Sequence, residues 1–174
     1  MFGGLTVRST SGLVPVRGGL FYRVDSPAEN ALVTPELARE IEKVLDLFAY
    51  EAGFTPDKPV GVVFEPGTLG HHKVGRAADI YAVGGFGMER WKQRWDHAMR
   101  AAAPPGESSA SRNMERKRNL GWRLYKALQR FGRWSQPYGF PIQLFGPWTR
   151  EEGPWKFISD PLLYAHKDHI HVAK

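Results

Sequence analysis

Apolar residues recur three or four positions apart in residues 34–52, which is the spacing of one buried helix face. Thr34 is a suitable N-cap, Pro35 suits the first helical position, and Gly53 supplies a stop signal. The pattern therefore predicts an amphipathic helix whose buried face consists of Leu37, Ile41, Val44, Leu45, Phe48 and Ala52.

The second half of the chain carries two more helical patterns, in residues 88–103 and 112–133, separated by a Pro-, Gly- and Ser-rich loop. In the latter segment the predicted inward residues are Leu120, Leu124, Ala127, Leu128 and Phe131. Eight basic residues lie largely on its other face: Arg112, Arg116, Lys117, Arg118, Arg123, Lys126, Arg130 and Arg133. Such a face is typical of a solvated surface, or alternatively of an electrostatic patch for a polyanion.

Short runs of β-branched and aromatic residues predict strands at residues 5–8, 12–17, 20–24, 59–64, 78–83 and 169–173. Pro15 restricts the second of these strands to a sheet edge. Residues 25–33 are predicted to form a loop, and the glycines of residues 84–87 are predicted to break the chain. Together the elements predict an α+β fold, with a small, mainly antiparallel sheet and helices packed on one side.

The histidines are concentrated in two short segments. Of the six histidines in the chain, all but His97 lie in residues 71–72 or 166–171, and each segment is accompanied by an aspartate, Asp79 or Asp168. Imidazole nitrogen and carboxylate oxygen are ligands of zinc, and a catalytic zinc keeps three protein ligands and one open position. The distribution predicts a metal site with His72, Asp79 and His171 as its ligands.

The spacing of these residues specifies how the chain must fold around the ion. His72 and Asp79 are seven positions apart, which is too far for the i, i+4 contact of one helix face and too far for one strand face, so a turn must bring them together. Gly75 is the expected turn residue, because glycine reaches positive φ without strain. Residues 169–173 alternate polar and apolar, so His169 and His171 share one face of a strand. Two neighbouring strands would present Asp79 and His171 to one ion.

These residues resemble a known zinc motif. The pattern His72-x-x-Gly75-x-Ala77-x-Asp79, followed by Asp168-His169-x-His171, is similar to that of the LAS metallopeptidases, the lysostaphin, D-Ala-D-Ala metallopeptidase and hedgehog group. The closest branch is that of the D-Ala-D-Ala carboxypeptidases and phage endolysins. The resemblance implies zinc at His72, Asp79 and His171, an acidic general base at Asp168, and hydrolysis of peptidoglycan stem peptides by a metal-activated water, as a carboxypeptidase or an endopeptidase.

Strand alternation leaves the identity of the general base open. Alternation continued to Asp168 would turn this carboxylate away from the face shared by His169 and His171. If the strand begins at about His169, Asp168 can act as the base and His169 can stabilise the oxyanion; otherwise His169 is the candidate base. A carboxypeptidase also needs a cation for the terminal carboxylate, and Arg76 is the candidate substrate-binding residue.

Length, composition and charge limit the remaining possibilities. The 174 residues suit one domain, with residues 88–155 as a helical and aromatic-rich insertion. The absence of cysteine excludes disulfides and thiolate ligands. The first residues lack the features of a secretory signal and no apolar run is long enough to span a membrane, so we expect cytoplasmic synthesis, with action on the cell wall after release or export by another route. The net charge of +6 favours an anionic partner such as the bacterial wall.

Two other functions remain possible at this stage. One is a non-catalytic, zinc-stabilised domain that binds wall polymer or nucleic acid through the basic helix, although no nucleic-acid reader motif is present, so a nucleic-acid partner is not expected. The other is a two-His, one-carboxylate iron oxygenase. That pattern usually separates its first histidine and carboxylate by two positions, unlike His72 and Asp79.

Overall fold

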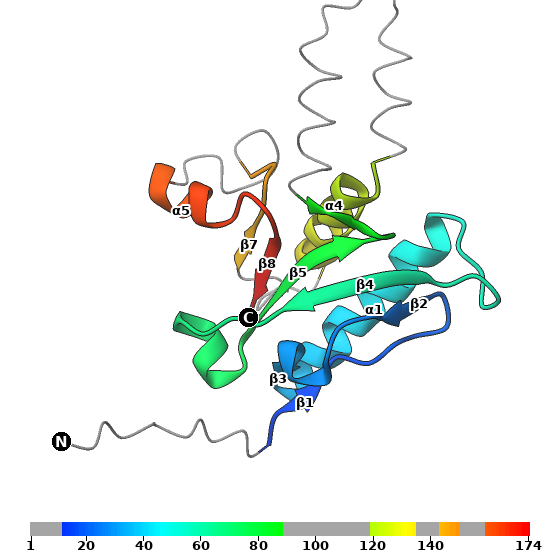
Figure 1. Ribbon diagram of the computed structural model, residues 1–174, viewed down its shortest axis with the longest axis horizontal. Helices are drawn as coiled ribbons and strands as arrows, with labels where there is room; N and C mark the ends of the chain where they lie inside the picture. Colours follow the sequence, from blue (N-terminus) through cyan, green and yellow to red (C-terminus); the bar gives the residue numbers. More distant parts are fainter. Residues whose placement is uncertain (1–11, 89–118, 135–142, 150–158) are drawn as a thin grey trace, which may run out of the picture.

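The computed structural model describes residues 12–88, 119–134, 143–149 and 159–174 (Figure 1). Within these residues, a six-stranded sheet has the order β2-β4-β5-β8-β7, with β6 paired to the end of β5. Its strands are β2 (Tyr22–Val24), β4 (Val60–Glu65), β5 (Ala77–Val83), β6 (Phe86–Gly87), β7 (Gln143–Phe145) and β8 (Ile170–Ala173). All neighbours are antiparallel except β2 and β4, which confirms the predicted mainly antiparallel sheet and the α+β class.

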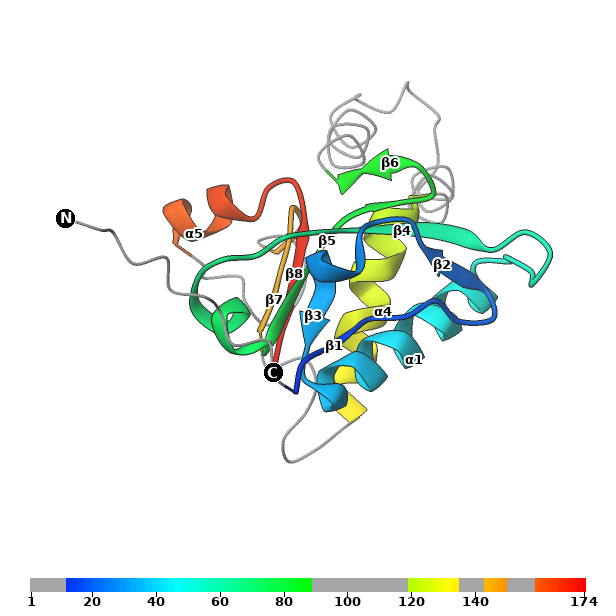
Figure 2. The same cartoon turned by 60° about the horizontal axis from the view of Figure 1, so that its bottom comes forward.

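Two helices cover one face of this sheet. Helix α1 (Pro35–Glu51) contacts α4 (Leu120–Trp134), and both lie behind β4 and β5 in Figure 1. Figure 2 shows the same arrangement from a second direction, with the short helix α5 (Asp160–Ala165) beyond β7. The expected packing of helices on one side is therefore confirmed for α1 and α4, whereas His166, the C-cap of α5, contacts His169 and His171 on the opposite face.

Helix α1 follows its sequence signals closely. The Thr34 side chain accepts a hydrogen bond from the Leu37 backbone N–H at 3.3 Å, and Pro35 is the first helical residue. Gly53, just after the helix, has a φ of 89°, the left-handed conformation that glycine tolerates. The predicted apolar face is buried from Leu37 to Phe48, where it forms the core together with Leu124 and Leu128 of α4 and the inner face of the sheet.

Several element boundaries differ from the predictions. The helix expected over residues 112–133 does not include Asn119, because the Asn119 side chain accepts a hydrogen bond from the Trp122 backbone N–H at 3.0 Å and so caps helix α4, which starts at Leu120. Residues 25–33 contain a 3-10 turn, η1 (Ala28–Ala31), and strand β3 (Leu32–Val33), which pairs with β1 (Val14–Pro15) in a separate two-stranded sheet. Residues 84–87 form a hairpin that leads into β6 rather than a break, because Gly84 and Gly85 both adopt positive φ.

Other predictions concern residues outside the described ranges. The strand at residues 5–8, the helix at 89–103 with His97, and the segment 112–118 are among them. Among the described residues, no helix is both long enough and apolar enough to cross a membrane.

Alternation along the central strands separates the core from a polar face. Ala78 and Ile80 of β5 and Ile170 and Val172 of β8 point into the core with α1 and α4. The intervening residues therefore point to the opposite face of the sheet. Asp79 and His171 are among them, so the candidate ligands lie on the face that these helices leave uncovered.

Candidate metal centre

A row of four residues crosses the uncovered face of the sheet. Glu65 on β4 is paired with Asp79 on β5, Asp79 with His171 on β8, and His171 with Phe145 on β7. Directly opposed residues on antiparallel strands hold their Cβ atoms about 4.5–5.5 Å apart. The sheet itself therefore brings Asp79 and His171 together across 92 positions of sequence.

A β-bulge is needed to put Glu65 in this row. The pairing of β4 with β5 changes register between Val63 and Phe64, which leaves Tyr81 as the extra residue of β5. Without the bulge, Glu65 would oppose Ile80, whose side chain belongs to the core. Bulges re-aim side chains and are common beside active sites. Here the bulge places the Glu65 carboxylate next to that of Asp79.

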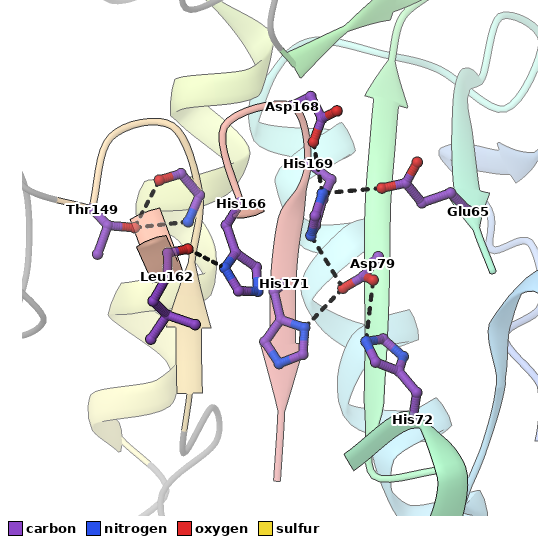
Figure 3. Close-up of polar contacts among 10 residues, drawn as sticks. Glu65, His72, Asp79, Thr149, Leu162, His166, Asp168, His169 and His171 are labelled. Carbon is purple, nitrogen blue, oxygen red and sulfur yellow. Dashed lines mark hydrogen bonds and ion pairs between the residues drawn. The ribbon is translucent and has the colours of Figure 1, made fainter. Parts of the chain in front are cut away.

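The third residue of the candidate site comes from a short 3-10 turn, η2 (Gly70–Val74), immediately before β5. Gly75 ends this turn with a φ of 68°, as expected for the glycine that folds His72 back over Asp79. His72 Nε2 lies 3.1 Å from Asp79 Oδ2, while His171 Nδ1 lies 2.8 Å from Asp79 Oδ1 (Figure 3). One ligand atom from each of the three residues lies within 4.8 Å of the other two, so the group can hold a metal ion.

Asp79 has the electrostatic character of an anionic ligand. Its side chain is buried, and burial by itself would raise the pKa of a carboxyl group. The hydrogen bonds with His171 and His72 and the nearby charge of His169 outweigh that effect and hold the pKa well below its ordinary range. Asp79 is therefore ionised at neutral pH, as a metal ligand must be.

His169 is held between three carboxylates. Its Nδ1 lies 2.9 Å from Asp168 Oδ1 and 3.0 Å from Glu65 Oε1, and its Nε2 lies 3.7 Å from Asp79 Oδ1. Burial alone would lower the pKa of this imidazole, but the hydrogen bond that it donates to Glu65, the charge of Asp79 and the hydrogen bond that it donates to Asp168 raise it to about 9. The ring is therefore a cation at neutral pH; its Nδ1 donates to Asp168, and its Nε2 faces the Asp79 carboxylate without a hydrogen bond.

Asp168 contacts His169 rather than Asp79. Strand β8 begins at Ile170, so strict alternation does not extend back to Asp168. Figure 3 shows Asp168 and Asp79 at opposite ends of the His169 ring. The arrangement places His169, through its Nε2, closer to the candidate ligands than Asp168.

Two further aromatic rings pack against the site. His166 Nδ1 donates to the Leu162 carbonyl at 2.7 Å, and its ring centroid lies 5.0 Å from those of both His169 and His171. Burial lowers the pKa of His166, which the hydrogen bond to Leu162 opposes only in part. Phe145 stacks on His171 with the ring centroids 5.8 Å apart and the ring planes 14° apart. Both rings limit the orientations open to His171.

Arg76 makes a structural contact. Its Nε donates to the Lys174 backbone oxygen at 2.6 Å, and the Lys174 backbone N–H donates to the Arg76 carbonyl at 3.0 Å. These bonds join the start of β5 to the end of β8. A role for Arg76 in binding a substrate carboxylate stays a prediction.

Basic residues of α4 also have structural partners. Arg123 donates to the Glu51 carbonyl at 3.1 Å, and Arg130 forms an ion pair with the Glu51 carboxylate at 2.6 Å. Both contacts tie α4 to the end of α1. These two guanidinium groups are thus engaged within the protein, on the helical side of the sheet.

Sequence reasoning missed Glu65 and Gly67. A side chain at position 67 would overlap the His72 imidazole, so this glycine leaves the room that the ring occupies. The only sequence signal for Glu65 was its position as a single charged residue directly after the apolar residues of strand β4 (Val60–Glu65).

Comparisons with protein-family models, with curated protein sequences and with solved structures found no match. The donor chemistry of His72, Asp79 and His171 is therefore the direct guide to what the site can bind. Two imidazoles and one carboxylate form a three-ligand set of the kind found at catalytic zinc ions, which keep a fourth position for water or substrate.

Proposed function

We propose that this chain is a zinc-dependent peptidase that hydrolyses peptidoglycan stem peptides or similar peptides containing D-amino acids. The observation that carries the proposal is the convergence of His72, Asp79 and His171 beside a fourth polar residue, His169. His72, Asp79 and His171 would hold the ion. A zinc ion in that position supplies a water of lowered pKa and polarises the scissile carbonyl.

The side chains around the ion would transfer protons and stabilise the negative charge that develops during the reaction. His169 Nε2 faces Asp79, so an imidazolium at this position can donate a hydrogen bond to an oxyanion next to the ligands. That proton can pass from Nε2 to the leaving amine, and the neutral nitrogen can then accept a proton from the next water that enters the site, which restores the imidazolium. Asp168 and Glu65 hold Nδ1 and fix the orientation of the ring. The geometry thus favours His169 over Asp168 as the proton-transfer group.

The proposed substrate class rests on the zinc motif and on charge. The resemblance to LAS metallopeptidases points to wall peptides, and the net charge of +6 favours adsorption to the anionic bacterial wall. Whether the enzyme removes a terminal residue or cuts within a chain depends on how the substrate carboxylate is bound.

The test is digestion of purified wall sacculi by the zinc-loaded full chain, with the released termini identified by mass spectrometry. We expect new peptide termini from the wild type and their loss in His171→Ala and His169→Gln. His71→Ala is the matched control, because His71 adjoins His72 but lies outside the group that can hold a metal. Elemental analysis identifies the metal retained on purification.

The outcome separates the proposed enzyme from a binding protein. Sacculi that bind the wild type but release no termini would support the non-catalytic domain and overturn the peptidase. Asp168→Asn distinguishes the two candidate bases, because it should lower the rate only modestly if Asp168 orients His169 and abolish cleavage if Asp168 takes the proton from water.

A further inference from the structure

Asp79 is flanked on both sides by groups that bind metals. On one side lie His171 and His72, the ligands proposed above. On the other lie Glu65, its partner in the neighbouring strand, and His169. A central carboxylate with potential ligands on two sides is the arrangement required for a bridge between two cations.

The second group is as compact as the first. One ligand atom each from Glu65, Asp79 and His169 lies within 4.8 Å of the other two. His169 and Asp79 are buried, whereas the Glu65 side chain is 33% exposed, so an ion can enter from the Glu65 side. Figure 3 shows Asp79 between the two groups: its Oδ1 faces both His171 of the first group and His169 of the second, and its Oδ2 faces His72.

We propose that Glu65, Asp79 and His169 form a second divalent-cation site, and that Asp79 bridges the two ions. This inference rests on the proposed metal centre, because Asp79 belongs to both groups. An ion at the second site would bind the neutral His169 ring in place of its proton, so the proton transfer proposed for His169 applies to the protein with one ion. The β-bulge supports the second site, because the irregular register is what sets Glu65 opposite Asp79 rather than opposite Ile80, a core residue.

The donor set indicates which cation would bind there. The first group offers two nitrogens and one carboxylate, whereas the second offers one nitrogen and two carboxylates. A third carboxylate lies close to the second group, with Asp168 Oδ1 2.9 Å from His169 Nδ1. Carboxylates suit harder ions such as Mn²⁺, and zinc also accepts mixed nitrogen and oxygen ligands. We therefore assign the site to Mn²⁺ or Zn²⁺, bound more weakly than at the first group because of the partly exposed Glu65.

A simpler arrangement would also satisfy these contacts. Three carboxylates around one imidazole attract positive charge, which a proton on His169 can supply without any second ion. The two arrangements differ in metal stoichiometry, since only the bridged centre takes up a second equivalent.

The experiment counts metal on chelator-treated full-length protein. Equilibrium dialysis against Zn²⁺ with elemental analysis should give a second equivalent for the wild type and its loss in Glu65→Gln, with the first equivalent retained. Glutamine keeps an oxygen that can accept from His169 but lacks the anionic charge that favours a cation. Glu29→Gln is the matched control, because Glu29 is exposed and remote in sequence from both groups.

A spectroscopic measurement on the wild type makes the result independent of how the variant folds. Two Mn²⁺ ions bridged by one carboxylate should give an exchange-coupled electron paramagnetic resonance spectrum once the second equivalent is added. A single equivalent in the wild type, uncoupled manganese, or a second equivalent that Glu65→Gln retains would each overturn the inference. Sacculus digestion by the same samples separates the two proposals: coupled ions without cleavage refute only the peptidase, and cleavage with one ion refutes only the second site.

Discussion

Gly67→Ala is expected to weaken zinc binding although residue 67 is not itself a ligand. A Cβ at this position would overlap the His72 imidazole. Carbon atoms in contact settle about 3.5–4.0 Å apart, so the ring or its loop must move by on the order of 1 Å. Metal–ligand distances tolerate only about 0.2 Å. The variant should therefore lose much of the contribution that His72 makes to zinc affinity.

The size of the loss follows from the kind of perturbation. Disturbing a residue that orients a ligand typically costs about 10–100-fold in metal affinity, or roughly 1.4–2.8 kcal/mol. The metal-free protein should unfold almost as the wild type does, because residues 66–70 lie at the surface and can shift. Calorimetric titration with zinc and denaturant unfolding in the presence of a chelator measure the two quantities.

Gly87→Ala provides the control for this comparison. A Cβ at Gly87 would lie 3.4 Å from the Tyr81 hydroxyl oxygen, an ordinary contact. Zinc affinity in Gly67→Ala equal to that of Gly87→Ala and the wild type would refute the assignment of His72 as a ligand. Equal destabilisation of the metal-free protein by both variants would point instead to a general effect on the sheet.

Three further predictions follow from the described contacts. Burial lowers the pKa of His169 but its carboxylate neighbours raise it from 6.5 to about 9, so the stabilising contribution of its charge is complete below about pH 6.5 and is lost as the pH rises through 9. Denaturant unfolding of the protein in a chelator should therefore show the free energy of unfolding falling by up to about 3 kcal/mol across that range, and His169→Gln should reduce this fall. Ile80→Ala, in the core, should cost about 2–5 kcal/mol of unfolding free energy, whereas Leu20→Ala at 59% exposure should change it by less than about 0.5 kcal/mol. If Arg76 binds the substrate carboxylate, Arg76→Ala should raise KM for peptides with a free C-terminus but not for amidated peptides. An equal change in KM for both kinds of peptide would refute this role and leave only the structural contact of Arg76 with Lys174.

Much of the fold was predictable because its signals are local. The cap at Thr34, the apolar spacing of α1 and the alternation in β8 each depend on neighbouring residues. The same holds for Gly75, whose positive φ is required by a turn of only a few residues. One prediction was wrong because a side chain competed with the expected pattern: Asn119 lies within the predicted helix but caps the start of α4 instead of being helical.

The pairing of strands was the part of the site that local patterns did not specify. His72, Asp79 and His171 could be grouped because each residue type is itself a metal ligand, and the sheet then needed only to place β5 beside β8. Glu65 gave no comparable signal, since a glutamate at the end of a strand is most often solvated. Its place beside Asp79 depends on a bulge at Tyr81 that shifts the register of β4 and β5 by one residue.

That dependence on register links the bulge to the chemistry of the site. A one-residue slip reverses the face to which every later side chain points. A regular register in which Tyr81 took the place opposite Phe64 would set Glu65 opposite Ile80, a core residue, while leaving Asp79 opposite His171, because the β5 and β8 pairing lies on the other edge of β5. The first group of ligands should then survive and the Glu65 contact to His169 should be lost. The bulge therefore bears on only one of the two proposed roles of this row: the charge that Glu65 places beside His169 depends on it, whereas the proposed ion site at Asp79 does not.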